Sequence, residues 1–325
     1  MSEVVVSVKN LETTFATKLG PFRAVNNISY DIQKGETLGI VGESGCGKSV
    51  TSYSLMRLIE SPGRVTGGQV ILNGQDLLKL PENKMEDVRG GEMAMIFQEP
   101  MTALNPVLTI GRQMDEQIMK HLKVSQKESQ ERAVEMLSLV GIPSPADRYH
   151  AYPHQLSGGM RQRAMIAMAL SCEPKFLIAD EPTTALDVTI QAQILELFQS
   201  LQQKFNMTVQ FITHDLGVIS EISDRVMVMY AGKTCEVADT QTLFENPKHP
   251  YTAALIKSRP KLGQRVRRLQ TIEGTVPAPW ELPKGCPFQN RCPNVLARCR
   301  DEMPPLTAMD SGGKHLAACF NPVGS

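Results

Sequence analysis

Short apolar runs alternate with amphipathic stretches along most of the chain. The runs at residues 37–41, 93–97, 176–179, 208–212 and 225–230 have the length of buried strands. Residues 49–58, 110–140 and 188–205 between them carry apolar side chains at helical spacing, and Pro143 and Pro145 end the second stretch. Strands that alternate with helices predict an α/β fold whose largely parallel sheet is covered on its faces.

Further strands are expected outside this alternation. Val4–Val8 and Ala24–Ile32 precede the run at 37–41, and Gln69–Leu72 leads into the turn signal Asn73-Gly74. Lys233–Val237 predicts a final exposed strand. Two strands before the first glycine-rich loop distinguish this chain from the simplest nucleotide-binding folds, in which that loop follows the first strand.

The composition changes after Ile256. Pro260, the basic residues Arg265, Arg267 and Arg268, and then Pro277, Pro279 and Pro283 predict a linker. A boundary near Tyr251–Arg259 divides the chain into a domain of residues 1–255 and a cysteine-rich region of residues 256–325. A length of 325 residues agrees with two domains, because single cores stop growing at about 250–300 residues.

Composition and charge narrow the function classes. A hydrophobic content of 42% and a charged content of 21% are typical of a soluble globular protein. A formal net charge of zero gives no support to nucleic-acid binding driven by bulk charge. Neither a membrane-spanning run nor a secretory leader is visible, so a cytoplasmic location is expected.

A phosphate-binding loop stands between the strand at 37–41 and the helix at 49–58. Its sequence is Gly42-Glu43-Ser44-Gly45-Cys46-Gly47-Lys48-Ser49, the P-loop pattern. Glycines let successive N–H groups point inward as an anion nest, and the helix that follows adds its positive end. Lys48 is expected to reach the β- and γ-phosphates, and the Ser49 hydroxyl to bind Mg²⁺.

Two carboxylates end the apolar run that begins at Phe176. Carboxylates at the carboxyl end of a parallel strand face the crevice where α/β sheets bind ligands. Asp180 is suited to hold Mg²⁺, and Glu181 to orient or deprotonate an attacking water.

A second candidate anion site begins at Leu156-Ser157-Gly158-Gly159-Met160-Arg161-Gln162. Ser157 stands where a helix N-cap belongs, and Gly158 and Gly159 expose backbone N–H groups. This stretch has neither a lysine nor a carboxylate partner of its own.

With these motifs in this order, the chain resembles the ATP-binding-cassette (ABC) ATPases, whose signature is Leu-Ser-Gly-Gly-Gln. Met160 replaces the last residue, as in some peptide importers. The resemblance implies a RecA-like core with an N-terminal antiparallel β subdomain. It also implies a helical signature subdomain at about residues 99–172 and a small metal-bound C-terminal extension.

The resemblance assigns further roles. Gln98 matches the glutamine that contacts Mg²⁺ and the attacking water, and His214 matches the switch histidine on the γ-phosphate. Ala185-Leu186-Asp187 matches the D-loop, which communicates across a dimer, and Phe15, or its competitor Phe22, stacks on adenine. The implied catalytic residues are Glu181, His214 and Gln98. The residues implied to bind the nucleotide or Mg²⁺ are Phe15, the P-loop residues 42–49 with the following Val50, and also Gln98, Ser157, Gly158, Gly159, Asp180 and Asp187.

In this family two cassettes pack head to tail, so that the P-loop of one and the signature of the other enclose each ATP. Closure driven by ATP and reversed by hydrolysis is a ligand-biased two-state motion. The helical insert is then expected to grip a membrane partner, with residues 98–106 relaying the motion.

Four of the seven cysteines crowd the last forty residues, with five, six and nineteen residues between Cys286, Cys292, Cys299 and Cys319. In a reduced compartment such clusters favour a metal over disulfides, and this spacing alone favours zinc over an iron–sulfur cluster. However, residues 246–252 with Gly285-Cys286-Pro287-Phe288 and Arg291-Cys292-Pro293 are similar to the C-terminal region of oligopeptide and dipeptide importer ATPases. That resemblance implies a 4Fe–4S cluster on the four cysteines, and zinc remains the alternative.

The implied function is ATP hydrolysis that drives a di- or oligopeptide importer at the cytoplasmic face of the cell membrane. The implied partners are a second ATPase, two transmembrane permease subunits and an external solute-binding protein, without nucleic acid. A nickel or other small-solute importer of the same subfamily is the alternative. A soluble cassette acting on nucleic acid or ribosomes, and a metal- or redox-sensing module, are more remote alternatives.

Overall fold

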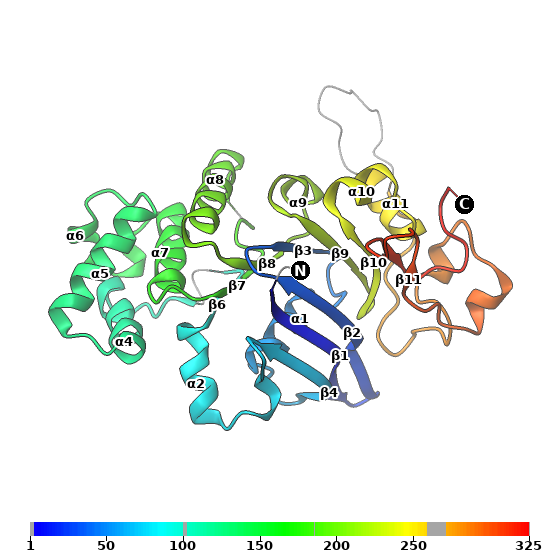
Figure 1. Cartoon of the computed structure of the whole chain (residues 1–325), viewed down its shortest axis with the longest axis horizontal. Helices are drawn as coiled ribbons and strands as arrows, with labels where there is room; N and C mark the ends of the chain where they lie inside the picture. The colour runs from blue at the N-terminus through cyan, green and yellow to red at the C-terminus, as the bar shows by residue number, and fades with distance from the viewer. Residues whose placement is uncertain (1–2, 100–102, 185, 259–270, 325) are drawn as a thin grey trace. The chain divides into compact units, whose positions relative to one another are not determined.

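The computed structural model describes residues 3–99, 103–184, 186–258 and 271–324 (Figure 1). The chain divides into two compact units. Unit 1 comprises Met1–Val5, Gln33–Gly35 and Lys79–Phe211, and unit 2 comprises Val6–Ile32, Glu36–Leu78 and Ile212–Ser325.

Unit 1 contains a buried parallel sheet. Strands β8 (Thr208–Ile212), β7 (Phe176–Asp180) and β6 (Met93–Ile96) are neighbours in that order, and β6 and β7 run parallel with Met93 opposite Phe176. Every residue of these strands is buried, as expected for a sheet covered on both faces. The apolar runs therefore predicted these strands correctly.

In the part of the helical insert from residue 104 to 172, four helices of unit 1 gather together in Figure 1. They are α4 (Ile110–Leu122), α5 (Gln126–Leu139), α6 (Pro145–Tyr149) and α7 (Gly158–Leu170). The continuous helical pattern predicted for 110–140 is interrupted, because Lys123 turns left-handed at φ 56°. Ser125 then caps α5 in a capping box with Glu128. Unit 1 also holds α2 (Glu82–Gly91) and α8 (Val188–Phe205).

Unit 2 contains the antiparallel β subdomain. Its sheet has the order β2 (Gly20–Gln33), β1 (Val4–Thr17), β4 (Gly63–Leu72) and β5 (Gln75–Asp76). Strand β4 pairs antiparallel with β1 and with β5. The first three strands are longer than the sequence pattern predicted. In β1 the pattern breaks at Lys9 and Asn10, two consecutive exposed residues where the pairing with β4 shifts register.

Unit 2 also contains five strands that are hydrogen-bonded neighbours in the order β11 (Thr307–Ala308), β12 (Leu316–Ala317), β10 (Lys233–Asp239), β9 (Arg225–Tyr230) and β3 (Thr37–Val41). Strands β3 and β9 are parallel, whereas β10 is antiparallel to β9 and β12, and β11 is antiparallel to β12. The prediction that Lys233–Val237 forms an exposed strand is wrong. Residues 234–238 are buried, because β9 pairs with one edge of β10 and the C-terminal strand β12 with the other.

Four helices complete unit 2: α1 (Lys48–Met56), α9 (Leu216–Ile222), α10 (Thr240–Glu245) and α11 (Pro250–Ser258). Short 3-10 turns lie at Leu77–Lys79, Pro153–Gln155, Gln289–Arg291 and Ala297–Arg300. The boundary expected near Tyr251–Arg259 falls on α11, while Pro260 and the basic residues Arg265, Arg267 and Arg268 lie outside the described residues. Among the helices that are described, none has the length and apolar content needed to cross a membrane.

Candidate nucleotide site and cysteine pocket

The P-loop connects β3 to α1 within unit 2. Gly47, the residue before α1, has a φ of 101°, and a Cβ atom there would lie 2.4 Å from the carbonyl oxygen of Ala24. Only glycine fits both conditions without strain. The backbone of this loop therefore makes the tight turn that the P-loop sequence predicts.

Lys48 turns its ammonium group back into the loop. The side chain is 5% exposed, and Nζ donates to the carbonyl oxygens of Gly42 at 2.8 Å and Glu43 at 3.2 Å. The Cys46 sulfur is 3.9 Å from the same nitrogen, and burial raises the pKa of this thiol although the charge of Lys48 lowers it. Ser49 and Val50 follow on the first turn of α1, both half-buried.

His214 follows the strand β8. The backbone N–H of Thr213 donates to the carbonyl oxygen of Ile40 at 3.3 Å, so this segment lies beside the end of β3, where the P-loop begins. Asp215 caps α9 by accepting from the N–H of Gly217 at 2.6 Å, and His214 is exposed before it.

In unit 1, Gln98 and Glu181 meet although 83 positions separate them. Gln98 Nε2 donates to Glu181 Oε2 at 3.3 Å, and Thr184 Oγ1 donates to the same oxygen at 2.9 Å. Glu181 adopts φ 46°, a left-handed conformation that non-glycine residues rarely take and that is concentrated at functional sites. Asp180 lies just before it, fully buried at the end of β7.

The signature segment caps α7 in the same unit. The Ser157 hydroxyl accepts from the N–H of Met160 at 3.3 Å, and a Cβ on Gly158 would have no atom within 4 Å. Gln162, which sequence reasoning did not select, is buried and donates from Nε2 to the carbonyl oxygen of Pro182. It thus ties the signature helix to the residue after Glu181. In the sequence, only the position of Gln162 about one turn into the signature helix could have indicated this contact.

The remaining candidate residues for nucleotide binding are Asp187, Phe15 and Phe22. Asp187 is exposed at the N-cap of α8, and its neighbour Ala185 in the predicted D-loop lies outside the described residues, as do residues 100–102 of the predicted relay. Phe15 and Phe22 stack on each other with ring centroids 5.5 Å apart, both half-buried. The two rings form one aromatic surface, so the choice between them stays a prediction.

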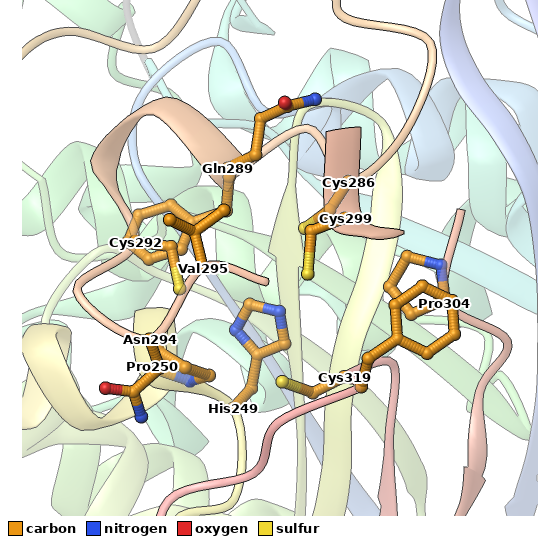
Figure 2. A pocket seen from close by; sticks show the side chains of 12 residues that line it. His249, Pro250, Cys286, Gln289, Cys292, Asn294, Val295, Cys299, Pro304 and Cys319 are labelled. Atoms are coloured by element: carbon orange, nitrogen blue, oxygen red, sulfur yellow. The ribbon is translucent and has the colours of Figure 1, made fainter. Parts of the chain in front are cut away.

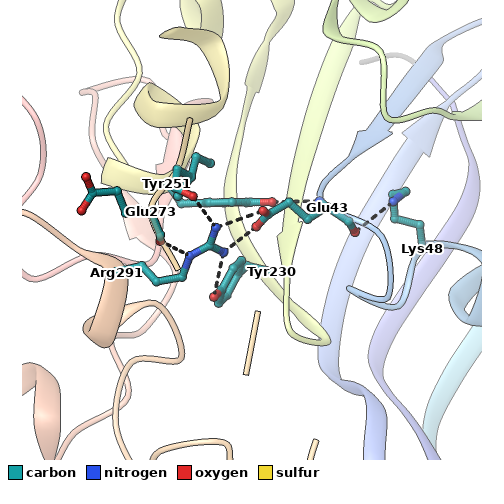
Figure 3. A network of polar contacts seen from close by, with 7 residues as sticks. Glu43, Lys48, Tyr230, Tyr251, Glu273 and Arg291 are labelled. Atoms are coloured by element: carbon teal, nitrogen blue, oxygen red, sulfur yellow. Dashed lines mark hydrogen bonds and ion pairs between the residues drawn. The ribbon is translucent and has the colours of Figure 1, made fainter. Parts of the chain in front are cut away.

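The P-loop has a partner that the sequence did not predict. The Glu43 carboxylate forms an ion pair with Arg291, with oxygen–nitrogen distances of 2.7 and 3.0 Å (Figure 3). The N–H of Glu43 donates to the Tyr251 hydroxyl oxygen at 2.9 Å. The only sequence signal for Arg291 is its place directly before Cys292.

The four clustered cysteines gather around one pocket, shown in Figure 2. Cys286, Cys292, Cys299 and Cys319 line it together with His249, and none of the described lining residues is charged. Gly285 allows the close approach, since a Cβ there would lie 2.2 Å from the carbonyl oxygen of Cys299. Burial raises the pKa of the Cys286 thiol to about 11, and that of the Cys319 thiol likewise to about 11.

The buried Glu236 of β10 anchors this region. Its carboxylate accepts from the N–H groups of Lys248 at 2.6 Å and His249 at 2.8 Å, and lies 2.6 Å from His315 Nε2.

The donor set of four thiols in the cysteine pocket suits a soft metal centre. Within the described ranges, no group of three or more His, Cys, Asp or Glu residues is close enough to hold a metal ion.

Comparison with known proteins agrees with this geometry. Residues 25–184 match the family of ABC transporters, and residues 235–299 match the C-terminal region of oligopeptide/dipeptide transporters. The chain is 52% identical to the dipeptide transport ATP-binding protein DppD of Bacillus subtilis, over 98% of this chain and 95% of the relative. The chain belongs to the ABC transporter family.

Further relatives support the same placement. The oligopeptide transport ATP-binding protein OppD of Salmonella typhimurium is 48% identical over 99% of this chain and 95% of its own length. The dimeric ATP-binding cassette MJ0796, in a post-hydrolysis state bound to ADP and Pi, is 27% identical with a TM-score of 0.65. That alignment covers 72% of this ABC ATPase and 98% of the cassette. This chain is an ATPase, with ATP and Mg²⁺ as its implied ligands.

Proposed function

We propose that this ABC ATPase hydrolyses ATP to drive the import of dipeptides or oligopeptides. The observation that carries the proposal is the C-terminal match at residues 235–299 on a chain about half identical, over nearly its whole length, to dipeptide and oligopeptide transport ATPases. The chain works at the cytoplasmic face of the cell membrane. Its partners are a second ATPase, two permease subunits and an external solute-binding protein.

The nucleotide is bound from unit 2. The P-loop N–H groups and Lys48 bind the phosphates, Ser49 binds Mg²⁺, and Phe15 or Phe22 stacks on the adenine. A lysine already positioned among loop carbonyls, 2.8 Å from that of Gly42, supports this role, because little reorientation is needed to bind a phosphate. The exposed His214 contacts the γ-phosphate.

Hydrolysis depends on groups of unit 1. Asp180 and Gln98 are Mg²⁺ ligands, and Glu181 orients and deprotonates the attacking water. The hydrogen bonds from Gln98 and Thr184 to one oxygen of Glu181 support this assignment, because they fix the position of the carboxylate. The strained φ of Glu181 agrees with such a role.

The signature helix serves the neighbouring cassette. Ser157, Gly158 and Gly159 bind the γ-phosphate of the ATP held by the second ATPase, and Asp187 communicates across the same interface. An exposed helix N-terminus with open space at Gly158 supports this assignment.

The cysteine pocket holds a 4Fe–4S cluster with a structural or regulatory role. Four thiols from separate segments converge on one uncharged pocket, which agrees with the preference of such clusters for thiolate ligands. Cys286, Cys292, Cys299 and Cys319 are the ligands. The bound cluster supplies folding energy to a segment that has few regular elements of its own.

Transport by the assembled importer tests the function. In a strain that lacks the native gene, Glu181→Gln is expected to abolish uptake of labelled di- and oligopeptides while the wild-type chain restores it. Hydrolysis by the assembly falls by roughly 100-fold or more, because the general base is lost. Nickel uptake restored without peptide uptake favours the alternative substrate, and undiminished peptide uptake by Glu181→Gln excludes the catalytic role.

Metal analysis tests the cluster separately. Anaerobically purified wild-type protein is expected to be brown and to contain iron and sulfide, and Cys292→Ser is expected to lose both. Cys172→Ser, a change of a buried cysteine outside the pocket, is the matched control and keeps the iron. Stoichiometric zinc without iron in the wild type contradicts the cluster and supports a zinc centre.

A further inference from the structure

Arg291 is a buried cation at the edge of the cysteine-rich segment. Its side chain is 5% exposed, and it ends the 3-10 turn Gln289–Arg291 that lies between Cys286 and Cys292. A buried guanidinium is costly unless its hydrogen-bond donors are satisfied. The contacts that satisfy it therefore define its role.

All five N–H groups of Arg291 have acceptors. Nε donates to the carbonyl oxygen of Glu273 at 2.9 Å, and Nη2 donates to that of Ile272 at 3.3 Å. Nη1 also donates to the Tyr230 hydroxyl at 3.3 Å. The remaining two donors form the paired bonds with Glu43, at 2.7 and 3.0 Å. Such a two-pronged pair fixes orientation as well as charge.

Glu43 connects Arg291 to Lys48, the proposed phosphate-binding lysine. Its carboxylate is held by Arg291, its N–H donates to Tyr251, and its carbonyl oxygen accepts from Lys48 Nζ at 3.2 Å (Figure 3). Two residues of the P-loop are thus linked to the C-terminal segment through consecutive hydrogen bonds, all within unit 2.

The surroundings of the pair make it rigid. The Arg291 guanidinium lies 5.8 Å from the Tyr230 ring centroid and 5.9 Å from that of Phe288. Tyr230 and Tyr251 pack edge to face at 4.7 Å. These rings cover the guanidinium, whose side chain is 5% exposed, while the side chain of Glu43 is 30% exposed. Because one partner is buried, loss of the pair is expected to affect the loop more than the loss of a fully exposed pair does.

We propose that Arg291 is a positioning residue of the nucleotide site, holding Glu43 so that the P-loop and Lys48 are preorganised for the phosphates of ATP. The C-terminal segment is then part of the ATP-binding apparatus. The proposal rests on the proposed nucleotide role of the P-loop. Its deciding test is the ATP affinity of the full-length chain by itself, so a failure of peptide transport leaves it standing.

Nucleotide titration of the full-length chain tests the proposal. Arg291→Ala is expected to weaken Mg-ATP binding about tenfold, within the range found for coupled residues in one network. In the assembled importer the KM for ATP rises by a similar factor while kcat changes less than about twofold, because preorganisation for binding is lost and the catalytic groups are intact. Arg291→Lys restores affinity only in part, since an ammonium cannot make the paired bonds. Arg300→Ala, at an exposed arginine of the same segment, is the matched control and keeps wild-type affinity.

A double-mutant cycle separates positioning from general destabilisation. Glu43→Gln is expected to weaken ATP binding to a similar degree, and adding Arg291→Ala to it should cause no further loss. Glu43→Gln leaves the sequence of the C-terminal segment unchanged and keeps a hydrogen-bond acceptor for Arg291, so it remains informative if Arg291→Ala does not fold. Unchanged affinity in Glu43→Gln, or multiplied losses in the double variant, overturns the proposal.

Hydrogen exchange supplies the reciprocal measurement. Coupling between two sites acts in both directions, so Mg-ATP is expected to slow exchange of residues 286–299 in the wild type but not in Glu43→Gln. Equal slowing in both proteins contradicts the proposed link.

Discussion

Helices α1 and α7 both have glycines at their starts, Gly47 directly before α1 and Gly158 as the first residue of α7, but they satisfy their first N–H groups in different ways. The residue before α1 is Gly47, which has no side chain to cap the helix, and Lys48 follows with its ammonium held by loop carbonyls. The residue before α7 is Ser157, whose hydroxyl accepts from the N–H of Met160 at 3.3 Å. The cation in the first turn of α7, Arg161, turns back to the carbonyl oxygen of Pro153 at 2.7 Å.

This difference separates a helix start that has its own positive charge for binding phosphate from one that has none and suits a phosphate bound mainly by other groups. The P-loop end of α1 combines a buried lysine with an uncapped N-terminus, which agrees with the proposal that it binds phosphate by itself. The end of α7 is capped and directs no lysine outward, so it suits an ATP that is already held by another cassette. The predictions below test this division, beginning with the largest expected effect.

Removal of the lysine should have the largest effect. Lys48→Ala is expected to reduce both ATP binding by the chain and hydrolysis by the assembly, the latter by roughly 100-fold or more, because the main positive charge on the phosphates is lost. Nucleotide titration and phosphate release measure the two effects. Wild-type ATP affinity in this variant contradicts the assignment of α1 as the charged half-site.

The same substitution at two glycines gives a matched comparison. Gly47→Ala is expected to destabilise the protein by about 1–3 kcal/mol and to weaken ATP binding, because a Cβ clashes with Ala24 at a φ of 101°. Gly158→Ala is expected to change stability by less than about 0.5 kcal/mol, since the space there is open. It should nevertheless lower hydrolysis by the assembly, because the added methyl group faces the second cassette's ATP.

Denaturant unfolding and phosphate release on both glycine variants check this pair of expectations. Equal destabilisation by the two changes, or full hydrolysis by an assembly containing Gly158→Ala, contradicts the distinction between the loops.

Loss of the serine cap should have a smaller effect on stability. Ser157→Ala is expected to cost about 1 kcal/mol, the usual value of an N-cap hydroxyl. Denaturant unfolding of the isolated chain measures it, with Ser125→Ala, which removes the cap of α5, as the control of similar size. A loss of ATP affinity in Ser157→Ala speaks against the separation of the two half-sites.

The sequence predicted those parts of the fold and the site that depend on local pattern. The buried strands β6 to β9 and the P-loop followed from continuous apolar runs and from glycines at fixed spacing. Gln98, Glu181 and His214 were selected through their order along the chain and the family resemblance. Their catalytic roles stay proposals.

Long-range pairing accounts for what could not be predicted. Strand β10 is buried because β12, almost eighty residues later, pairs with it, and no local pattern announces this. Arg291 holds Glu43 across 248 positions, and Gln162 bonds to a backbone carbonyl that any residue could supply. The end of β1 was also missed, because the consecutive exposed residues Lys9 and Asn10 at a register shift interrupt the alternation.

The central claim is that this chain binds ATP with its own P-loop but completes another cassette's site with its signature helix. Paired measurements on Ser157→Arg test it most directly: ATP affinity of the chain alone, and hydrolysis by the full assembly. The predicted result is an affinity within about twofold of wild type together with hydrolysis reduced about tenfold or more. Weakened ATP binding by the isolated chain, or undiminished hydrolysis by the assembly, contradicts the claim.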